Sequence, residues 1–402
     1  MIMRAVPAAV ALCASSFAAC TLEPSDAETG VASSEVIGGG NAATGKWPDV
    51  AAVLFAGQQA CTGVLIAPTV ALTAGHCNDP DLTSILIGTT SLARPSDGET
   101  LQVAKRIEYP SSISTEDFTL LVLERASRVA PRAIATGWAR LDIKNSARVA
   151  LVGYGAIDRD AQQYINDLQE AETTITDADC TQKPGCNASV VPGGELGAGG
   201  MGIDTCPGDS GGPLYLLTDY GAFVAGITSR AYDDAQYACK DGGIYGRPDK
   251  IVDWIEQNAG VAVTRGPEPT ADRITTVRGT GGETSIAAND PKSKQHVFKI
   301  ATPPAHGTAA VRDDGRVRVC SDPGAAGEDA VVVNVADPAD PARNLDVRIP
   351  VTVEDGPPGA DCSADAFEGD TGGCCDSGRS PRGSVPLALG VLLVLRRRRR
   401  WR

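Results

Sequence analysis

The chain has 402 residues, 42% of them apolar, which is enough for two or three domains with packed cores. Aromatic residues make up only 4%, whereas glycine (45) and proline (26) are frequent, so strands and loops are favoured over a helical bundle. The formal net charge is −14 although six arginines stand in the last seven residues, and this acidity argues against nucleic acid as a partner.

The N-terminal residues 1–20 have the layout of a signal peptide. Arg4 precedes an apolar run, and small residues follow up to Cys20. The last four residues, FAAC, are similar to a bacterial lipobox, in which Cys20 would be lipidated; ordinary signal cleavage nearby is the alternative. Twelve cysteines also indicate disulfides and export, because a reducing cytosol rarely leaves so many in one chain. The polar residues 21–35 predict a short leader.

Many short apolar runs follow between residues 36 and 262. They include VAAVLF, CTGVLIA, TLLVLE and AFVAGITS, and Gly, Pro and Asp turns separate them. This spacing predicts an all-β barrel or sandwich. A helix is expected over residues 248–260 (PDKIVDWIEQNAG), because its amphipathic pattern ends at a glycine.

Three segments of this region predict nucleophilic catalysis. Ser210 lies in GDSGGP, His76 in LTAGHC and Asp117 in EDFTLLVL. A serine attacks only when a base takes its proton and a carboxylate orients that base. These segments, in this order, resemble the trypsin-like (chymotrypsin-fold) serine proteases, with Gly75 where that family has an alanine. The resemblance covers residues 36–260 and implies a double β-barrel with a C-terminal helix and a triad of His76, Asp117 and Ser210.

The same resemblance assigns roles to neighbours of the triad. The backbone N–H groups of Gly208 and Ser210 would form the oxyanion hole, and Ser229 matches the family serine near the buried aspartate. It also implies the disulfides Cys61–Cys77 and Cys206–Cys239. The family's third pairing is altered here, because its second cysteine position falls near Gly197, and Cys180–Cys186 is expected as a local loop in its place.

Activation by cleavage is a further implication. The segment SSEVIGGG is similar to the family's activation site, so a cut after Glu35 would free the amino group of Val36 to pair with buried Asp209. Since Glu35 is not basic, we expect a separate activating protease to make this cut.

Asp204, six residues before the serine, would lie at the bottom of the specificity pocket. A buried carboxylate there selects Arg or Lys, and Gly243 matches a pocket-wall glycine that leaves room for a long side chain. The rim departs from the family pattern at Ser229-Arg230-Ala231. Arg230 is therefore expected either to neutralise Asp204 or to repel a basic substrate side chain.

A second β region is expected after a linker at residues 263–273. Alternating apolar residues over 274–355 predict a small β-sandwich that resembles an Ig-like or cadherin-like repeat. A Cys/Gly-rich spacer (356–383) and a tail (384–402) follow. The tail combines eleven apolar residues with terminal arginines and is similar to the MYXO-CTERM sorting signal; a simple tail anchor is the alternative. The pairing of the remaining cysteines stays open: Cys320, Cys362, Cys374 and Cys375.

Together these features predict a secreted or cell-surface serine endopeptidase made as a zymogen that cuts after Arg or Lys. Protein or peptide substrates are the expected partners, the chain is expected to be monomeric, and a lipid or the C-terminal tail would supply a membrane link. No cofactor and no metal are expected. Two alternatives remain: a catalytically inactive relative used for binding, and a surface adhesion protein that acts mainly through the second β region.

Overall fold

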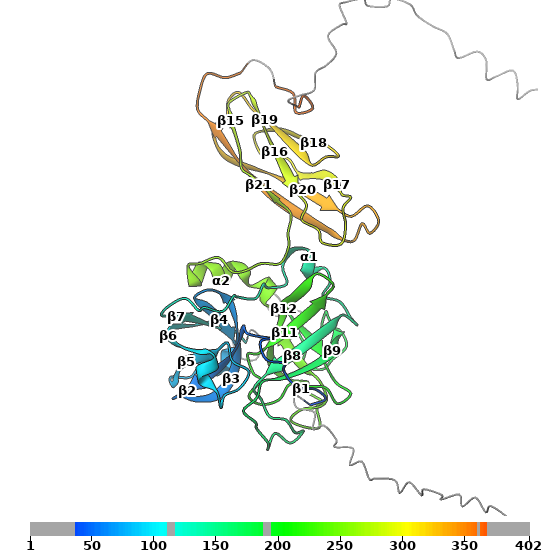
Figure 1. Ribbon diagram of the computed structural model, residues 1–402. Helices are drawn as coiled ribbons and strands as arrows, with labels where there is room; N and C mark the ends of the chain where they lie inside the picture. The colour runs from blue at the N-terminus through cyan, green and yellow to red at the C-terminus, as the bar shows by residue number, and fades with distance from the viewer. Residues whose placement is uncertain (1–36, 111–116, 188–193, 360–361, 368–402) are drawn as a thin grey trace, which may run out of the picture. The chain divides into compact units, whose positions relative to one another are not determined.

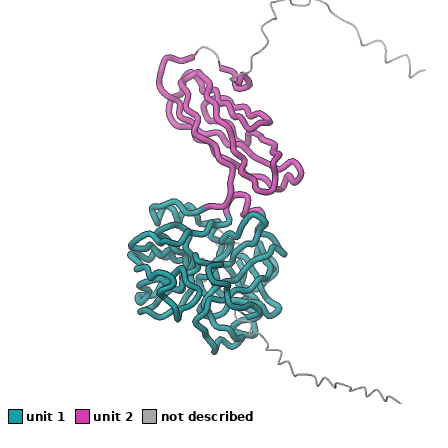
Figure 2. Tube along the Cα trace, in the orientation of Figure 1, with its two compact units in different colours: residues 1–135, 142–264 teal, residues 136–141, 265–402 magenta. Residues whose placement is uncertain are grey.

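The computed structural model describes residues 37–110, 117–187, 194–359 and 362–367. The chain divides into two compact units (Figure 2). Unit 1 comprises Met1–Ala135 and Asp142–Thr264, and unit 2 comprises Thr136–Leu141 and Arg265–Arg402. The expected signal peptide with Cys20, the leader with Glu35, and Val36 lie outside the described residues, as does the tail from residue 368.

Unit 1 contains a first, closed six-stranded barrel (Figure 1). Its strands follow the order β2-β3-β4-β7-β6-β5. Apart from β6, in which polar residues predominate, they contain apolar runs whose side chains are buried either inside the barrel or in the core shared with the neighbouring sheet. The strands are β2 (Val50–Phe55), β3 (Gln58–Ala67), β4 (Val70–Thr73), β5 (Leu82–Ile87), β6 (Glu99–Glu108) and β7 (Thr119–Leu123).

A second sheet of seven strands completes unit 1. Its order is β1-β9-β10-β13-β12-β11-β8, and an additional β9–β8 pairing closes it. The fold is thus an all-β double barrel, as the sequence predicts. The strands are β1 (Gly40–Asn41), β8 (Arg148–Gly153), β9 (Gln169–Asp177), β10 (Glu195–Ala198), β11 (Pro213–Thr218), β12 (Gly221–Ala231) and β13 (Gly243–Gly246).

Helices are few and short among the described residues. The helix expected over 248–260 begins as a 3₁₀ turn, η3 (Pro248–Lys250), and continues as α2 (Val252–Ala259). Gly260 ends it in the left-handed conformation, with φ of 70°. Two other 3₁₀ turns are η1 (Gly75–Cys77) and η2 (Pro95–Asp97). No helix of the described chain is long and apolar enough to cross a membrane.

Unit 2 consists of two four-stranded sheets and a short helix, α1 (Gly137–Arg140). The sheet orders are β14-β16-β19-β18 and β15-β21-β20-β17. Alternate residues of β20 and β21 are buried in a common core, as the alternating sequence predicts. The strands are β14 (Thr270–Ala271), β15 (Ile274–Val277), β16 (Gly281–Ala287), β17 (Val297–Thr302), β18 (Gly307–Val311), β19 (Arg316–Ser321), β20 (Gly327–Ala336) and β21 (Asn344–Glu354).

Trp138 of α1 belongs to the core of unit 2. It is fully buried, and its indole Nε1 donates to the carbonyl of Ala288 at 2.6 Å. The Arg343 guanidinium lies over the ring, 5.2 Å from its centroid. The sequence pattern predicts that the second β region begins after a linker at 263–273. In the structure, residues 136–141 also belong to this unit.

Four disulfides link described cysteines. Two of them pair residues close in the chain, Cys61–Cys77 and Cys180–Cys186. The third, Cys206–Cys239, joins the loop that carries Ser210 (the serine loop) to the segment before β13. The fourth, Cys320–Cys362, is in unit 2, where the sequence leaves the pairing open. Cys374 and Cys375 lie outside the described residues.

Candidate active site

His76 and Asp117 meet where two paired strands end. β4 and β7 are antiparallel neighbours with Thr73 opposite Thr119, so the residues after β4 adjoin those before β7. The backbone N–H of His76 donates to Asp117 Oδ1 at 2.8 Å, and His76 Nδ1 contacts Oδ2 at 2.8 Å. The carboxylate is 4% exposed, whereas 35% of the His76 side chain is exposed. Asp117 therefore orients a ring whose other face is open to solvent.

Two neighbours complete the surroundings of Asp117. The hydroxyl of Ser229 donates to Oδ2 at 2.7 Å. A Cβ on Gly75 would come within 2.9 Å of Oδ1, so the glycine permits the close approach of carboxylate and backbone. This gives a physical reason for the departure from alanine in LTAGHC.

Ser210 lies on the loop between β10 and β11, packed against the strand end that leads to His76. The N–H of Thr62 donates to the Ser210 carbonyl at 2.9 Å. Gly211 has φ of +81°, and a Cβ there would lie 2.1 Å from Thr73 Oγ1 and 2.5 Å from the backbone nitrogen of Ala74. Only glycine fits both the backbone conformation and the space. The structure thus brings the serine loop to the barrel edge that carries His76.

Gly208 has its carbonyl turned into the protein. The carbonyl accepts hydrogen bonds from Thr62 Oγ1 at 2.8 Å and from Gln59 Nε2 at 3.1 Å. Its φ is +98°, and a Cβ would lie 2.9 Å from the Cα of Gly155. Within the described part of the chain, the N–H groups of Gly208 and Ser210 donate to no protein acceptor. Two backbone donors beside the serine are therefore available to a substrate oxygen.

Asp209, the residue before the serine, is 1% exposed. Its carboxylate accepts from the N–H of Gly155 at 2.7 Å and of Cys206 at 2.9 Å. Burial raises the pKa of Asp209 to about 7, and the nearby charge of Asp204 raises it too. No lysine, arginine or histidine of the described residues forms an ion pair with it.

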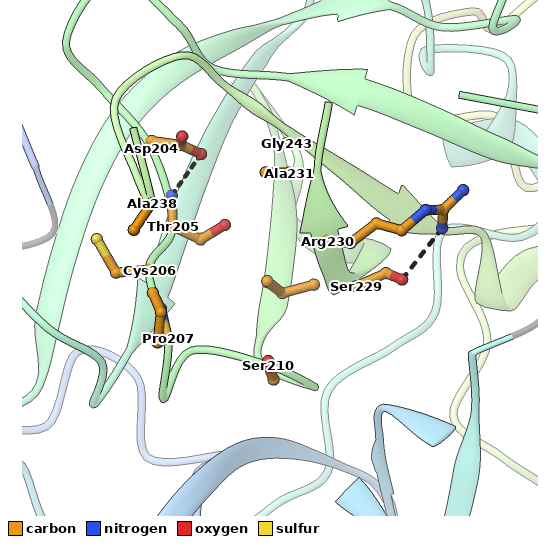
Figure 3. A pocket seen from close by; sticks show the side chains of 11 residues that line it. Asp204, Thr205, Cys206, Pro207, Ser210, Ser229, Arg230, Ala231, Ala238 and Gly243 are labelled. Carbon is orange, nitrogen blue, oxygen red and sulfur yellow. Dashed lines mark hydrogen bonds between the residues drawn. The ribbon is translucent and has the colours of Figure 1, made fainter. Parts of the chain in front are cut away.

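A pocket of about 200 Å³ extends from Ser210 to Asp204 (Figure 3). Asp204 is 2% exposed and accepts from the N–H groups of Thr205, Lys240 and Gly242 at 2.8 to 2.9 Å. Burial raises the pKa of Asp204 to about 6, against the lowering effect of these three bonds. The pocket is lined by Asp204, Thr205, Cys206, Pro207, Ser210, Thr228, Ser229, Arg230, Ala231, Ala238 and Gly243.

Arg230 does not contact Asp204. Figure 3 shows its guanidinium turned away from that carboxylate. It forms two hydrogen bonds to Glu195, at 2.6 and 3.0 Å, and a third to the carbonyl of Gly185 at 2.8 Å. Neither role expected for Arg230, neutralising Asp204 or repelling a basic side chain, is supported by this geometry, because Glu195 already compensates its charge. A Cβ on Gly243 would lie 3.5 Å from Asp204 Oδ1, so the glycine widens the pocket at its base.

Glu195, Thr62 and Gln59 lie at the site but were not among the residues expected there from the sequence. Glu195 is the first residue of β10 and is 3% exposed, and an acid in such a buried strand could have signalled a buried carboxylate. No local sequence pattern predicts Thr62 or Gln59, because both act by donating a hydrogen bond to the carbonyl of Gly208, which is more than 140 residues away in the sequence.

The described residues contain one cluster with potential metal ligands, Cys180, Cys186 and Glu195. The two sulfurs form a disulfide and offer no thiolate, so this cluster does not fit a metal.

The residues after the expected activation cleavage lie beside the pocket. The carbonyl of Ile37 accepts from the N–H of Asp204 at 3.3 Å. Gly38 has φ of +88°, and a Cβ on Gly39 would lie 2.0 Å from the carbonyl oxygen of Glu170. Glycines at these two positions therefore let the chain reach the Asp204 segment.

Comparison with known proteins gives a consistent result. A family model described as Trypsin matches residues 36–255, more than half of the chain. Kallikrein-8 of Rattus norvegicus is 28% identical over 217 residues, which cover 52% of this chain and 80% of that protein. Serine protease 56 of Mus musculus is 30% identical over 246 residues, 58% of this chain and 40% of that protein. A solved structure of neuropsin, a serine protease expressed in the limbic system of mouse brain, is 26% identical and covers 55% of this chain and 98% of that one, with a TM-score of 0.46.

Proposed function

Since this chain belongs to the trypsin family and is a trypsin-like serine endopeptidase, we propose that His76, Asp117 and Ser210 form its catalytic triad. The observation that carries the proposal is the pair of 2.8 Å contacts from Asp117 to the backbone and ring of His76, beside the serine loop. With Nδ1 engaged by Asp117, the other ring nitrogen, Nε2, takes the proton of Ser210 as its Oγ attacks the scissile carbonyl. His76 then donates this proton to the leaving amine, and water hydrolyses the acyl-enzyme.

The oxyanion that forms in each tetrahedral intermediate would bind to the N–H groups of Gly208 and Ser210. Both donors lack protein acceptors in the described chain, and the hydrogen bond from the N–H of Ala156 to the carbonyl of Pro207, at 3.0 Å, holds the peptide plane that carries the Gly208 N–H. Donors that are already oriented stabilise the developing charge without reorganisation, an effect worth about 3–4 kcal/mol per donor in related chemistry.

Activation would depend on Asp209. A carboxylate buried without a cation is costly, and the raised pKa of Asp209 reflects this cost. Cleavage after Glu35 would supply the Val36 ammonium group as its partner. The proximity of Ile37 to the Asp204 segment supports this route, since Val36 is the preceding residue. The zymogen and its separate activating protease are thus part of the proposal.

Cleavage after Arg or Lys follows from Asp204 at the base of the pocket. An Arg or Lys side chain would exchange its hydration for a charge-assisted bond to this carboxylate, and a neutral side chain would leave the charge unpaired. The Glu195 contacts of Arg230 remove the expected conflict with a basic substrate.

Two variants of the enzyme with Val36 as its N-terminus test these roles, with peptide-library profiling as the assay. Ser210→Ala is expected to lower kcat/KM by at least about 10³-fold, because no nucleophile remains. Asp204→Ser is expected to remove cleavage after Arg while the enzyme still acylates with a small active-site reagent. Unchanged hydrolysis of an Arg peptide by Asp204→Ser would refute the specificity assignment, and persistent activity of Ser210→Ala would refute the triad.

Export and a surface location are also proposed. The four disulfides support an oxidising compartment. The lipidation of Cys20, the MYXO-CTERM tail, the Ig-like or cadherin-like character of unit 2 and the monomeric state rest on sequence patterns. Mass spectrometry of the N-terminal peptide of the precursor would test the lipidation of Cys20, and mass spectrometry of the C-terminal peptide of the surface form would test the processing of the tail.

A further inference from the structure

Arg230 and buried Glu195 form an ion pair beside the proposed triad. The two hydrogen bonds are parallel, Nη1 to Oε1 at 2.6 Å and Nη2 to Oε2 at 3.0 Å. The side chains are 28% and 2% exposed. A bidentate contact of this kind fixes the plane of the guanidinium. Glu195 has a second donor as well, the N–H of Asn187 at 3.0 Å.

Sheet pairing explains why these two residues meet. β13 lies between β10 and β12, with Gly246 opposite both Glu195 and Ile227. The pairing between β12 and β13 shifts register between Thr228 and Arg230. Such an irregularity re-aims the side chains that follow it, and here Arg230 reaches across to Glu195.

The ion pair is connected to the triad by hydrogen bonds. Arg230 Nη1 contacts the hydroxyl of Ser229 at 3.3 Å, as Figure 3 shows. Ser229 donates to Asp117 Oδ2 at 2.7 Å, and the same oxygen contacts His76 Nδ1 at 2.8 Å. A chain of contacts thus runs from Glu195 to the imidazole.

We propose that the Glu195–Arg230 pair is a positioning element of the triad, which fixes Ser229 and sets the electrostatic potential at Asp117. This inference rests on the proposed triad. Both residues act on the triad through Ser229 and Asp117, and Arg230 also lines the pocket. The pair is specific to this chain's rim sequence, in which arginine follows Ser229.

The charges of the two carboxylates are coupled. Burial raises the pKa of Glu195, the hydrogen bonds from Arg230 lower it, and the charge of Asp117 raises it again. Arg230 therefore compensates one buried carboxylate that lies near another. If the cation is removed, the remaining negative charge favours the protonated imidazole; if Glu195 is neutralised, the remaining cation disfavours it.

Other charged groups lie on neighbouring elements and are the same in every variant. Asp204 and Asp209 lie on the serine-loop side. Glu108 on β6 accepts from Asn78, two residues after His76, at 3.0 Å. Lys183, in the Cys180–Cys186 loop, lies over the Tyr232 ring.

The test is the acid limb of the pH profile of kcat/KM, which reports the protonation of the base in the free enzyme. Arg230→Met is expected to move this limb to higher pH and Glu195→Gln to lower pH, each by on the order of 0.5 pH unit. The double variant is expected to return close to the unsubstituted enzyme. Arg230→Lys keeps the charge and is expected to leave the limb in place even where it lowers kcat.

Arg132→Met is the matched control. It breaks another buried ion pair of unit 1, in which Arg132 donates to Asp49 at 2.5 and 3.1 Å, and neither residue contacts the triad. The acid limb of the kcat/KM profile of Arg132→Met is expected to stay in place, although the melting temperature of this variant falls.

Two outcomes would overturn the inference: single variants that lose kcat with an unmoved limb, or limbs that move in the same direction. If Arg230→Met does not fold, the isosteric Glu195→Gln decides alone, and an unmoved limb there is sufficient to reject it. Failure of the triad itself is seen separately, as hydrolysis by the parent enzyme that survives Ser210→Ala.

Discussion

Asp204 and Asp209 lie five residues apart on the serine loop, and each is almost completely buried without a cation among the described residues. Each carboxylate accepts backbone N–H groups, yet burial still raises both pKa values, to about 6 and about 7. These are the two carboxylates to which the proposed function assigns an incoming positive charge, the substrate side chain for Asp204 and the Val36 amine for Asp209. A buried carboxylate without a cation favours the binding of one. This is the physical basis of the proposed selectivity at Asp204 and of the proposed activation at Asp209.

Asp209 gives a prediction about maturation. Since its folded-state pKa of about 7 lies above the unfolded value of 3.8, its contribution to stability is complete below pH 3.8 and is lost as the pH rises through 7. An amine with a pKa of about 8 offsets this loss once Val36 is free. Cleavage after Glu35 is therefore expected to raise the melting temperature more at pH 7.5 than at pH 5.

The measurement is differential scanning calorimetry of the precursor and the cleaved form, both carrying Ser210→Ala to prevent digestion. Asp209→Asn in both forms is the control and should remove the pH dependence of the difference. An equal gain at the two pH values would contradict the role of Asp209.

At the scale of elements, the sequence predicts what local pattern encodes. VAAVLF is β2, CTGVLIA lies within β3 and AFVAGITS lies within β12, because barrel strands keep apolar runs between turns. The partnership of Arg230 with Glu195 was not predictable, since it needs β10, β13 and β12 side by side and a register shift. The same limit applies to α1, whose four residues carry no periodic pattern and whose tryptophan is buried among residues more than 130 positions away.

Substitution of Trp138 tests the assignment of α1 to unit 2. Trp138→Ala removes the buried ring and its hydrogen bond to Ala288, and is expected to cost about 3–5 kcal/mol in the unfolding free energy of unit 2. Arg140→Ala, an exposed position of the same helix, is the matched control and is expected to change it by less than about 0.5 kcal/mol. Thermal unfolding followed by tryptophan-independent far-UV circular dichroism measures both. Equal effects of the two variants would remove Trp138 from the core of unit 2.

At the scale of the whole molecule, each unit is stabilised by its own apolar core and its own disulfides. Unit 1 has apolar cores and three disulfides, and unit 2 has its own apolar core and the Cys320–Cys362 disulfide. The acidic net charge of −14 favours solubility and contributes nothing specific to either core. The catalytic groups proposed above all belong to unit 1, so its activity can be used to follow its folding.

Removing the Cys320–Cys362 disulfide therefore tests whether catalysis is independent of the stability of unit 2. The two cysteines are 42 positions apart, and opening a loop of that length is expected to destabilise unit 2 by about 2–4 kcal/mol. The double variant Cys320→Ser/Cys362→Ser should lower the temperature of the unfolding transition of unit 2 and leave kcat/KM on a short Arg peptide unchanged.

Cys206→Ser/Cys239→Ser, which opens the serine loop, is the contrasting variant. It should lower kcat/KM, because this disulfide joins the serine loop to the segment whose N–H groups bind Asp204. Loss of peptide hydrolysis in the first variant at temperatures where unit 1 stays folded would show that catalysis depends on unit 2, contrary to this expectation.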